Sequence, residues 1–225
     1  MPYRKTPLVE GQYYHIFNRG VNKQPIFLDS RDYARAIELI KFYQFANQTI
    51  KYSRFKNFAL TQREKIWDNL LTTNDRLIGI VAFCLMPNHF HFLLKQLQNN
   101  GISRFVAHWQ DSFSRYFNTK HERIGPLVQG QFKAVRVEND SQLLHLSRYI
   151  HLNPLDSYLV KDMGALRQYP WSSLREYLGG TDQNICDKEI VLKQFKKPSD
   201  YERFVSDFSD YQKKIKTVDH LTFEE

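Results

Sequence analysis

Residues 83–94 run Phe-Cys-Leu-Met-Pro-Asn-His-Phe-His-Phe-Leu-Leu, and this stretch decides the expected fold. An apolar segment at 77–84 and a second run at 89–95 flank Met-Pro-Asn, a pattern that predicts a β-hairpin. Alternate residues of a strand share a face, so His89 and His91 should point the same way, with Phe90 turned into the core. Two imidazoles about 7 Å apart along a strand can converge on one divalent metal ion. A purely structural role for the pair is the alternative.

The rest of the chain supplies the other elements of an α+β domain. A strand rich in aromatic residues is expected at 12–18 and a further strand at 131–137. Amphipathic helices are expected at 30–46, 102–120 and 141–153, the last ended by Pro154. The order strand, helix, strand, strand, helix, strand, helix predicts a ferredoxin-like antiparallel sheet with helices packed on one face.

Two segments lie outside this pattern. Residues 47–76 are polar and mixed, with one short helix expected at 61–71, and we interpret them as an insertion. Gly179-Gly180 marks a boundary between a domain at 1–180 and a C-terminal extension at 181–225. A capping-box pattern at residues 199–202 predicts one helix in this extension.

Charge and composition narrow the class of protein. The 225 residues carry 32 Lys and Arg against 24 Asp and Glu, a net charge of +8. Residues 187–225 carry −1, so residues 1–186 carry +9, which favours a polyanionic partner, nucleic acid first. A solvated basic surface is the alternative. Two cysteines, no apolar run of about 18 residues and no apolar signal core after Met1 predict a cytoplasmic protein without membrane segments.

The helix expected at 141–153 offers a second half of a site. Leu143, Leu146 and Ile150 form its apolar stripe, and a polar stripe beside it includes Tyr149 and Asn153. If this stripe meets the histidine pair, a metal held by His89, His91 and Asn153 could polarise a phosphodiester. The hydroxyl of Tyr149 could then attack the phosphorus.

Other assignments of these residues remain open. Asn153 precedes a proline and could cap the helix end rather than bind a metal. Tyr116, on the helix at 102–120, is a competing nucleophile, although its spacing suits packing. His145 and His151 flank Tyr149, and a surface or core-edge position is favoured for both.

At this point the sequence resembles a known family. Residues 86–94 are similar to the histidine-hydrophobe-histidine motif of the HUH single-tyrosine transposases, the insertion-sequence-200-like family. Residues 148–154, Arg-Tyr-Ile-His-Leu-Asn-Pro, resemble the tyrosine motif of its REP-associated branch, and the segments 14–20, 130–133 and 171–173 also match. The resemblance covers roughly residues 10 to 180. The insertion and the extension depart from it.

The resemblance implies an HUH nuclease fold, a Mg²⁺ or Mn²⁺ cofactor, and single-stranded or hairpin DNA as substrate. It further implies Tyr149 as the nucleophile that forms a 5′-phosphotyrosine, with Asn153 completing the metal shell of His89 and His91. A nucleoid-associated location in the cytoplasm and a homodimer, with sites within one subunit or across two, are compatible with it.

Residues in or beside the matched segments are candidates for contact with DNA. The phosphate-binding candidates are Arg19, Lys133, Arg136 and Arg148, and the base-stacking candidates are Tyr14 and Phe132. A solvated cation is the alternative for each basic residue. Two rival functions are a non-catalytic or domesticated nucleic-acid-binding protein of the same fold, and a metal-dependent phosphodiesterase that uses water.

Overall fold

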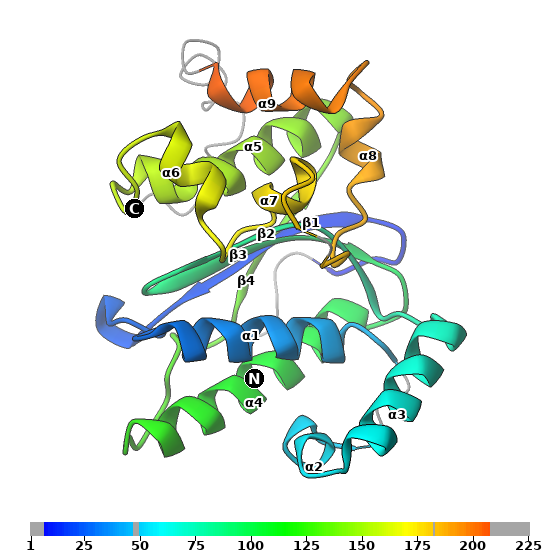
Figure 1. The fold of residues 1–225 in the computed structure, drawn as a ribbon, viewed down its shortest axis with the longest axis vertical. Coiled ribbons are helices and arrows are strands. Elements are labelled where there is room, and N and C mark those ends of the chain that lie inside the picture. The colour runs from blue at the N-terminus through cyan, green and yellow to red at the C-terminus, as the bar shows by residue number, and fades with distance from the viewer. Residues whose placement is uncertain (1–6, 47–49, 182, 208–225) are drawn as a thin grey trace.

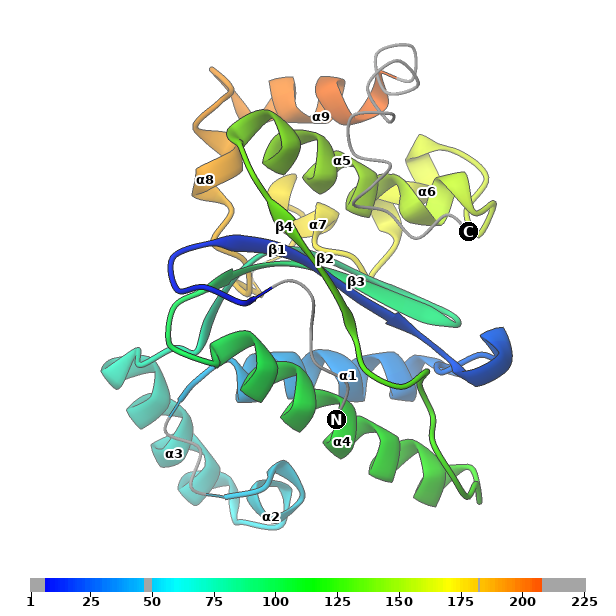
Figure 2. The same ribbon diagram turned by 180° about the vertical axis from the view of Figure 1, so that it is seen from behind.

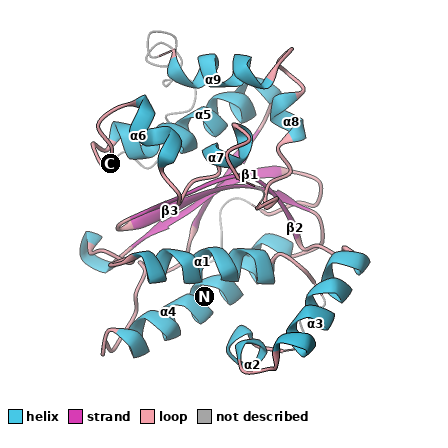
Figure 3. Ribbon diagram, viewed as in Figure 1, coloured by secondary structure: helices cyan, strands magenta, loops and turns pink. Residues whose placement is uncertain are grey.

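The computed structural model describes residues 7–46, 50–181 and 183–207, and it places a four-stranded antiparallel sheet between two layers of helices (Figure 1). Figure 3 shows the same view coloured by secondary structure. The strands are β1 (Tyr13–Arg19), β2 (Ile78–Met86), β3 (His89–Gln96) and β4 (Lys133–Val137). The longer helices are α1 (Ser30–Tyr43), α3 (Leu60–Thr73), α4 (Gly101–Lys120), α5 (Asp140–Asp156) and α9 (Pro198–Ser206). The short helices are η1 (Val21–Lys23), α2 (Tyr52–Lys56), α6 (Met163–Gln168), α7 (Leu174–Tyr177) and α8 (Glu189–Leu192).

β2 and β3 form the hairpin that the sequence predicts. Met86 pairs with His89, so Pro87 and Asn88 alone separate the two strands. β2 continues two residues beyond the expected end at 84, because the antiparallel ladder runs up to the turn itself. The hairpin therefore holds the histidine pair at the very start of β3.

The strand order β2-β3-β1-β4, with every neighbouring pair antiparallel, confirms the ferredoxin-like arrangement. The connection from β1 through α1 to β2 skips one position in the sheet, and β3 fills it. This order makes β1 and β3 neighbours, with Arg19 opposite His89 and Phe17 opposite His91. Residues directly opposite one another in an antiparallel pair share a face, so these four side chains lie on one side of the sheet.

Helices cover both faces of the sheet, which corrects the expectation of one covered face. α1 and α4 lie on one face, and α5 to α9 lie on the other (Figure 2). All nine residues of β2 are buried, because a strand that is apolar on both sides requires cover on both sides. No helix within the described ranges is long and apolar enough to cross a membrane.

α5 continues through Pro154 and ends at Asp156, which corrects the expectation that it stops at 153. Proline lacks an N–H and removes one helical hydrogen bond, but the next turn closes through Ser157, whose N–H donates to the Asn153 carbonyl at 3.0 Å. At the other end, the side chain of Asn139 caps the helix by accepting from the N–H of Gln142. Asn153 is thus an interior helical residue, one turn after Tyr149.

The insertion and the extension each contain the expected helix. α3 corresponds to the helix predicted at 61–71, and it projects with α2 beyond the end of α1 (Figure 1). α9 is the predicted tail helix and packs on α5, while the single turn α8 has no predicted counterpart. Residues 47–49 of the insertion and 208–225 of the extension lie outside the described residues.

Candidate active site

The histidine pair faces α5, as the alternation of strand residues predicts. The rings of His89 and His91 lie 4.9 Å apart between centroids and are perpendicular to each other. Phe90 points to the opposite face, where it joins the aromatic core beneath α1 and α4 and contacts Trp109. The β3 strand therefore divides its side chains between a chemical face and a packing face.

His89 is a neutral imidazole between two amide oxygens. Burial lowers its pKa to about 4, and the charge of nearby Arg19 acts in the same direction. Its Nδ1 lies 2.6 Å from Oδ1 of Asn88, and its Nε2 lies 3.2 Å from Oδ1 of Asn153. A neutral imidazole has one N–H and can donate to one of these oxygens. With the proton on Nδ1, at the shorter contact, the Nε2 lone pair faces the Asn153 oxygen.

His91 is held by a third histidine, which the sequence analysis did not assign to the site. Nε2 of His15 on β1 lies 2.9 Å from Nδ1 of His91, and the two rings stack with centroids 5.1 Å apart. Both side chains are fully buried. Burial, together with the neighbouring histidines, lowers the pKa of His91 well below its usual value. The contact with His15 fixes the orientation of the His91 ring, as a second ligand shell does in metal sites.

Tyr149 comes from α5 and packs against the edges of this histidine group. Its ring centroid lies 5.6 Å from that of His91 and 6.2 Å from that of His15, in perpendicular arrangements. The residue is 4% exposed, and Asn153 follows it by four positions on the same side of the helix. One helix therefore delivers a phenol and an amide oxygen to the histidine pair.

A pocket of about 260 Å³ opens over these groups and is lined by residues of β1, the hairpin and α5. The lining residues are Arg19, Asn88, His89, Tyr149, Asn153, Asp156 and Ser157. Asn88, Asp156 and Ser157 are additions to the predicted set. Asp156 follows Asn153 by three positions on α5, a spacing that would have indicated it had the helix been expected to pass Pro154.

The structure divides the candidates for contact with DNA into an accessible group, described first, and a buried group. Arg19 lies in the pocket, while Lys133 and Arg136 are exposed on the edge strand β4 and Phe132, just before it, is half-buried. The guanidinium of Arg136 donates to the side-chain oxygen of Gln12 at 2.8 Å. These four residues keep surface or pocket positions at the end of β1, on β4 or just before β4.

The predictions that Arg148 and Tyr14 contact DNA are wrong, because neither side chain is exposed. Arg148 is 0% exposed, donates to the carbonyl of Phe204 at 3.0 Å, and lies 4.0 Å from the centre of the Phe204 ring. Tyr14 points to the α1 and α4 side of the sheet, where its hydroxyl donates to the Pro7 carbonyl. Arg148 therefore anchors α9, and Tyr14 belongs to the core.

The structure also shows where the competing nucleophile and the two histidines beside Tyr149 lie. Tyr116 lies on α4, on the other side of the sheet, with the guanidinium of Arg35 4.7 Å from its ring centre. His151 is fully buried between the hydroxyl groups of Tyr201 at 2.7 Å and Ser173 at 2.8 Å. His145 lies 3.0 Å from the Arg148 guanidinium. None of these three side chains lines the pocket over Tyr149.

The structure resembles solved proteins. It matches a REP-associated tyrosine transposase solved bound to a REP hairpin, with a TM-score of 0.53 and 15% sequence identity. The match covers 80% of this chain and 86% of that one, and at this identity it shows a common fold. A comparison with curated protein sequences gives no match.

A comparison with protein-family profiles shows the family of the chain as well as its fold. The profile described as "Transposase IS200 like" matches residues 9–153, which begin before β1 and include Tyr149 and Asn153. The matched region contains the whole sheet and most of α5, while α6 to α9 lie beyond it. The chain therefore belongs to the IS200-like transposase family.

Proposed function

We propose that this protein cleaves and rejoins single-stranded or hairpin DNA through a covalent 5′-phosphotyrosine intermediate on Tyr149, with a divalent metal ion as cofactor. One observation carries the proposal: β3 and α5 bring His89, Asn153 and Tyr149 together around one pocket. Membership of a transposase family supports DNA cleavage and strand transfer in general. The hairpin bound by the structural neighbour is a precedent for the form of the DNA.

The donor atoms of the pocket fit Mg²⁺ or Mn²⁺. The Nε2 atom of His89 and Oδ1 of Asn153 are 3.2 Å apart, and both can act as metal ligands when the His89 proton is on Nδ1. Neighbouring ligands of an octahedral ion at about 2.1 Å lie about 3 Å from one another, so a cation suits this pair. We infer that His89, His91 and Asn153 hold the ion. The described residues contain no cluster of three or more His, Cys, Asp or Glu side chains suited to a metal, and the third ligand that we propose is the amide oxygen of Asn153.

The reaction exchanges one phosphodiester for another. The hydroxyl of Tyr149 loses its proton, and its oxygen forms a bond to phosphorus while the bond from phosphorus to the 3′ oxygen breaks. The departing 3′ oxygen takes up a proton and becomes a free hydroxyl. A bound divalent cation supplies Lewis-acid polarisation of the phosphate. Because the phosphotyrosine conserves the energy of the broken bond, attack by a 3′ hydroxyl rejoins DNA without ATP.

The protein contributes position and charge to this exchange. The perpendicular contact of Tyr149 with His91 fixes the phenol ring at the wall of the pocket. Arg19, on the same wall, places a permanent positive charge where the attacked phosphate must lie. Lys133 and Arg136, exposed on β4, are proposed contacts for the DNA backbone beyond the pocket.

The proposal is tested by incubating the protein with a labelled single-stranded DNA hairpin and Mn²⁺, then separating the products under denaturing conditions. Wild-type protein should give a denaturant-stable adduct that disappears with EDTA. Tyr149→Phe should bind DNA and give no adduct, whereas the matched variant Tyr116→Phe should behave as wild type.

Each other outcome favours a rival. Cleavage without an adduct would identify a phosphodiesterase that uses water. DNA binding without cleavage would identify a non-catalytic binding protein. An adduct that persists in Tyr149→Phe would remove Tyr149 from the role of nucleophile.

A further inference from the structure

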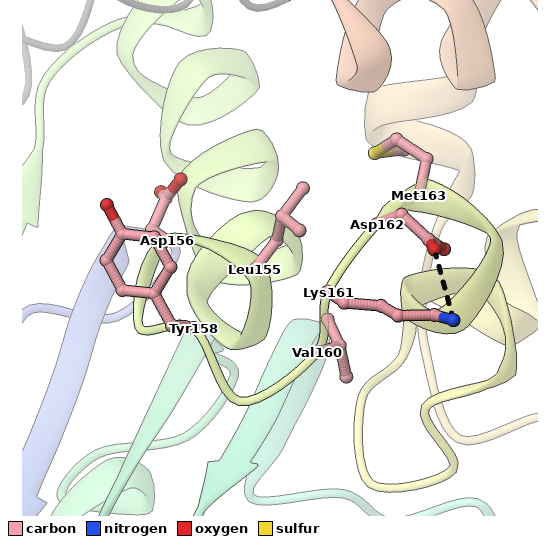
Figure 4. Close-up of a pocket in the computed structure, with 7 residues that line it drawn as sticks. All are labelled: Leu155, Asp156, Tyr158, Val160, Lys161, Asp162 and Met163. Atoms are coloured by element: carbon pink, nitrogen blue, oxygen red, sulfur yellow. Dashed lines mark ion pairs between the residues drawn. The ribbon is translucent and has the colours of Figure 1, made fainter.

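A second and larger pocket lies at the end of α5, next to the candidate active site (Figure 4). Its volume is about 500 Å³, and it is lined by the last turn of α5 and the segment that leads into α6. The lining residues are Leu155, Asp156, Tyr158, Val160, Lys161, Asp162 and Met163. Asp156 also lines the pocket over Tyr149, so the two cavities share a wall. The shared residue Asp156 lies three positions, less than one helical turn, after Asn153 on α5.

Tyr158 is an unusual residue for its position. Its backbone has a φ of +57°, in the left-handed region just after the helix cap, where glycine is the usual residue. The turn is fixed because the N–H groups of Leu159 and Val160 both donate to the Pro154 carbonyl, at 2.9 and 3.1 Å. The side chain is nevertheless 94% exposed. The ring therefore gains little from packing in return for the strained backbone, and it stands in solvent at the edge of the pocket.

We propose that this second pocket binds one unpaired base of the DNA strand beside the cleaved phosphate, with the ring of Tyr158 stacked on that base. The proposal rests on the proposed function for the position of the cleaved phosphate. Aromatic side chains stack on unpaired bases without regard to their sequence. The hydrogen-bonded turn fixes the backbone from which the exposed ring of Tyr158 projects.

The chemistry of the lining favours a base over a phosphate group. Leu155, Val160 and Met163 supply apolar surface. The carboxylates of Asp156 and Asp162 supply hydrogen-bond acceptors, although Oδ1 of Asp162 also accepts from the Ala165 N–H at the start of α6. Carboxylates repel phosphate but accept from the exocyclic amino groups of cytosine, adenine or guanine. Lys161 is mostly exposed and lies 4.0 Å from Asp162, a position suited to a backbone phosphate at the rim. The pocket should therefore prefer a base with an amino group over thymine.

Stepwise removal of single bases tests this subsite. The probe is a fluorescent DNA hairpin with single-stranded flanks of mixed sequence, in which one abasic site is moved from position to position. Affinity is measured by anisotropy at one fixed salt concentration, because salt alone changes the affinity for DNA. Wild-type protein should lose about tenfold in affinity when the abasic site reaches one particular flanking position.

The variants locate that loss. Tyr158→Ala should bind the intact probe about tenfold more weakly and show no further loss at the sensitive position, whereas Tyr158→Phe should behave as wild type. Thermal unfolding of both variants should match that of wild type, because the side chain is exposed. The proposed subsite is overturned if Tyr158→Ala binds the intact probe normally or if no flanking position is sensitive to the abasic site. It is also overturned if the loss of affinity from Tyr158→Ala and the loss from the abasic site multiply when the two are combined.

Failure of the subsite and failure of the proposed function give different results. The binding measurement requires no cleavage and can be repeated with Tyr149→Phe. If wild type forms no adduct but the Tyr158-dependent position is still found, the proposed cleavage fails and the base pocket stands. If adducts form on Tyr149 and no position depends on Tyr158, the reverse holds.

Discussion

The two faces of the sheet are both buried, but they are filled with different chemistry. Beneath α1 and α4 lies an apolar core rich in aromatic rings, in which Phe90, Phe92 and Trp109 pack edge to face. Beneath α5 the same strands bury His15 and His91, and the facing helix buries Arg148, His151 and Asn153. A buried polar group is unfavourable unless it finds a partner, so the second face is built from specific contacts. Both faces stabilise the fold, since the second also contains an apolar cluster, but only the second face positions the proposed reacting groups.

Removal of a histidine from the polar face should have the largest effect on cleavage. We expect His91→Ala to reduce Mn²⁺-dependent cleavage by about 100-fold or more, since even the partners of metal ligands contribute about 10- to 100-fold. The matched variant Phe92→Leu changes the next side chain of β3, on the apolar face, and should keep cleavage near wild type. The cleavage rates of wild type and both variants are compared, and circular dichroism shows whether the variants are folded. Undiminished cleavage in His91→Ala would make the pair structural.

Truncation on the apolar face should have the reverse effect. Trp109 is 1% exposed, and its indole N–H donates to the Ala36 carbonyl at 3.0 Å. Trp109→Ala should lower the free energy of unfolding by about 3–5 kcal/mol. The rate of adduct formation per folded molecule should not change at a temperature where the variant is folded. Urea titration and active-site counting separate the two quantities, and a slower rate per folded molecule would contradict the division between the faces.

His15 should produce a smaller change in cleavage than His91, because it acts through another residue. His15→Phe removes the partner of His91 Nδ1 and should raise the Mn²⁺ concentration needed for half-maximal cleavage by about 10- to 100-fold. The maximal rate at saturating Mn²⁺ should fall less. An unchanged metal dependence would show that the stacked pair is a packing feature. A loss that no Mn²⁺ concentration restores would place His15 among the reacting groups.

The smallest expected effect is a difference in how one buried residue on each face makes the free energy of unfolding depend on pH. Burial lowers the pKa of His151 from 6.5 to about 3, so between these values the unfolded chain takes up a proton and the folded chain does not. The free energy of unfolding therefore falls progressively as the pH falls from 6.5 to about 3. On the other side, burial would raise the pKa of Asp32, but hydrogen bonds from Lys120, the Leu28 N–H and His121 lower it overall. Its contribution is retained down to about pH 4 and lost below.

Urea midpoints measured from about pH 7 to about pH 3 test this difference. Wild type should lose stability from about pH 6.5 downward, and His151→Gln should lose less over the range above about pH 4. Asp32→Asn should follow wild type in that range and differ from it in its dependence below about pH 4. Equal slopes for wild type and His151→Gln would show that His151 does not titrate with folding.

Local patterns predicted a large part of this molecule. Alternation along residues 89–95 placed His89 and His91 on one face, and helical spacing placed Tyr149 and Asn153 on another element facing them. Both patterns depend on backbone geometry within a few residues, which the amino-acid types determine. The order of the elements then determined the ferredoxin-like sheet.

Other features depend on contacts between distant segments, which spacing does not encode. The role of His15 follows from the register of β1 against β3. The burial of Arg148 follows from the docking of α9, more than fifty positions later, and a guanidinium on a polar stripe gives no sign of it. The passage of α5 through Pro154 placed Asp156 in the pocket, because helical hydrogen bonding resumes after the proline, with the Ser157 N–H donating to the Asn153 carbonyl.

Identification of the atom that carries the DNA tests the central claim most directly. Wild-type protein is incubated with a hairpin oligonucleotide and Mn²⁺, the DNA is trimmed by nuclease, and the modified peptide is found by mass spectrometry. Trypsin releases residues 149–161 as one peptide, which contains both Tyr149 and Tyr158, so fragmentation must locate the nucleotide. We predict a 5′-phosphonucleotide on Tyr149. Modification of Tyr116 or Tyr158, or cleaved DNA with no modified peptide, would contradict the account.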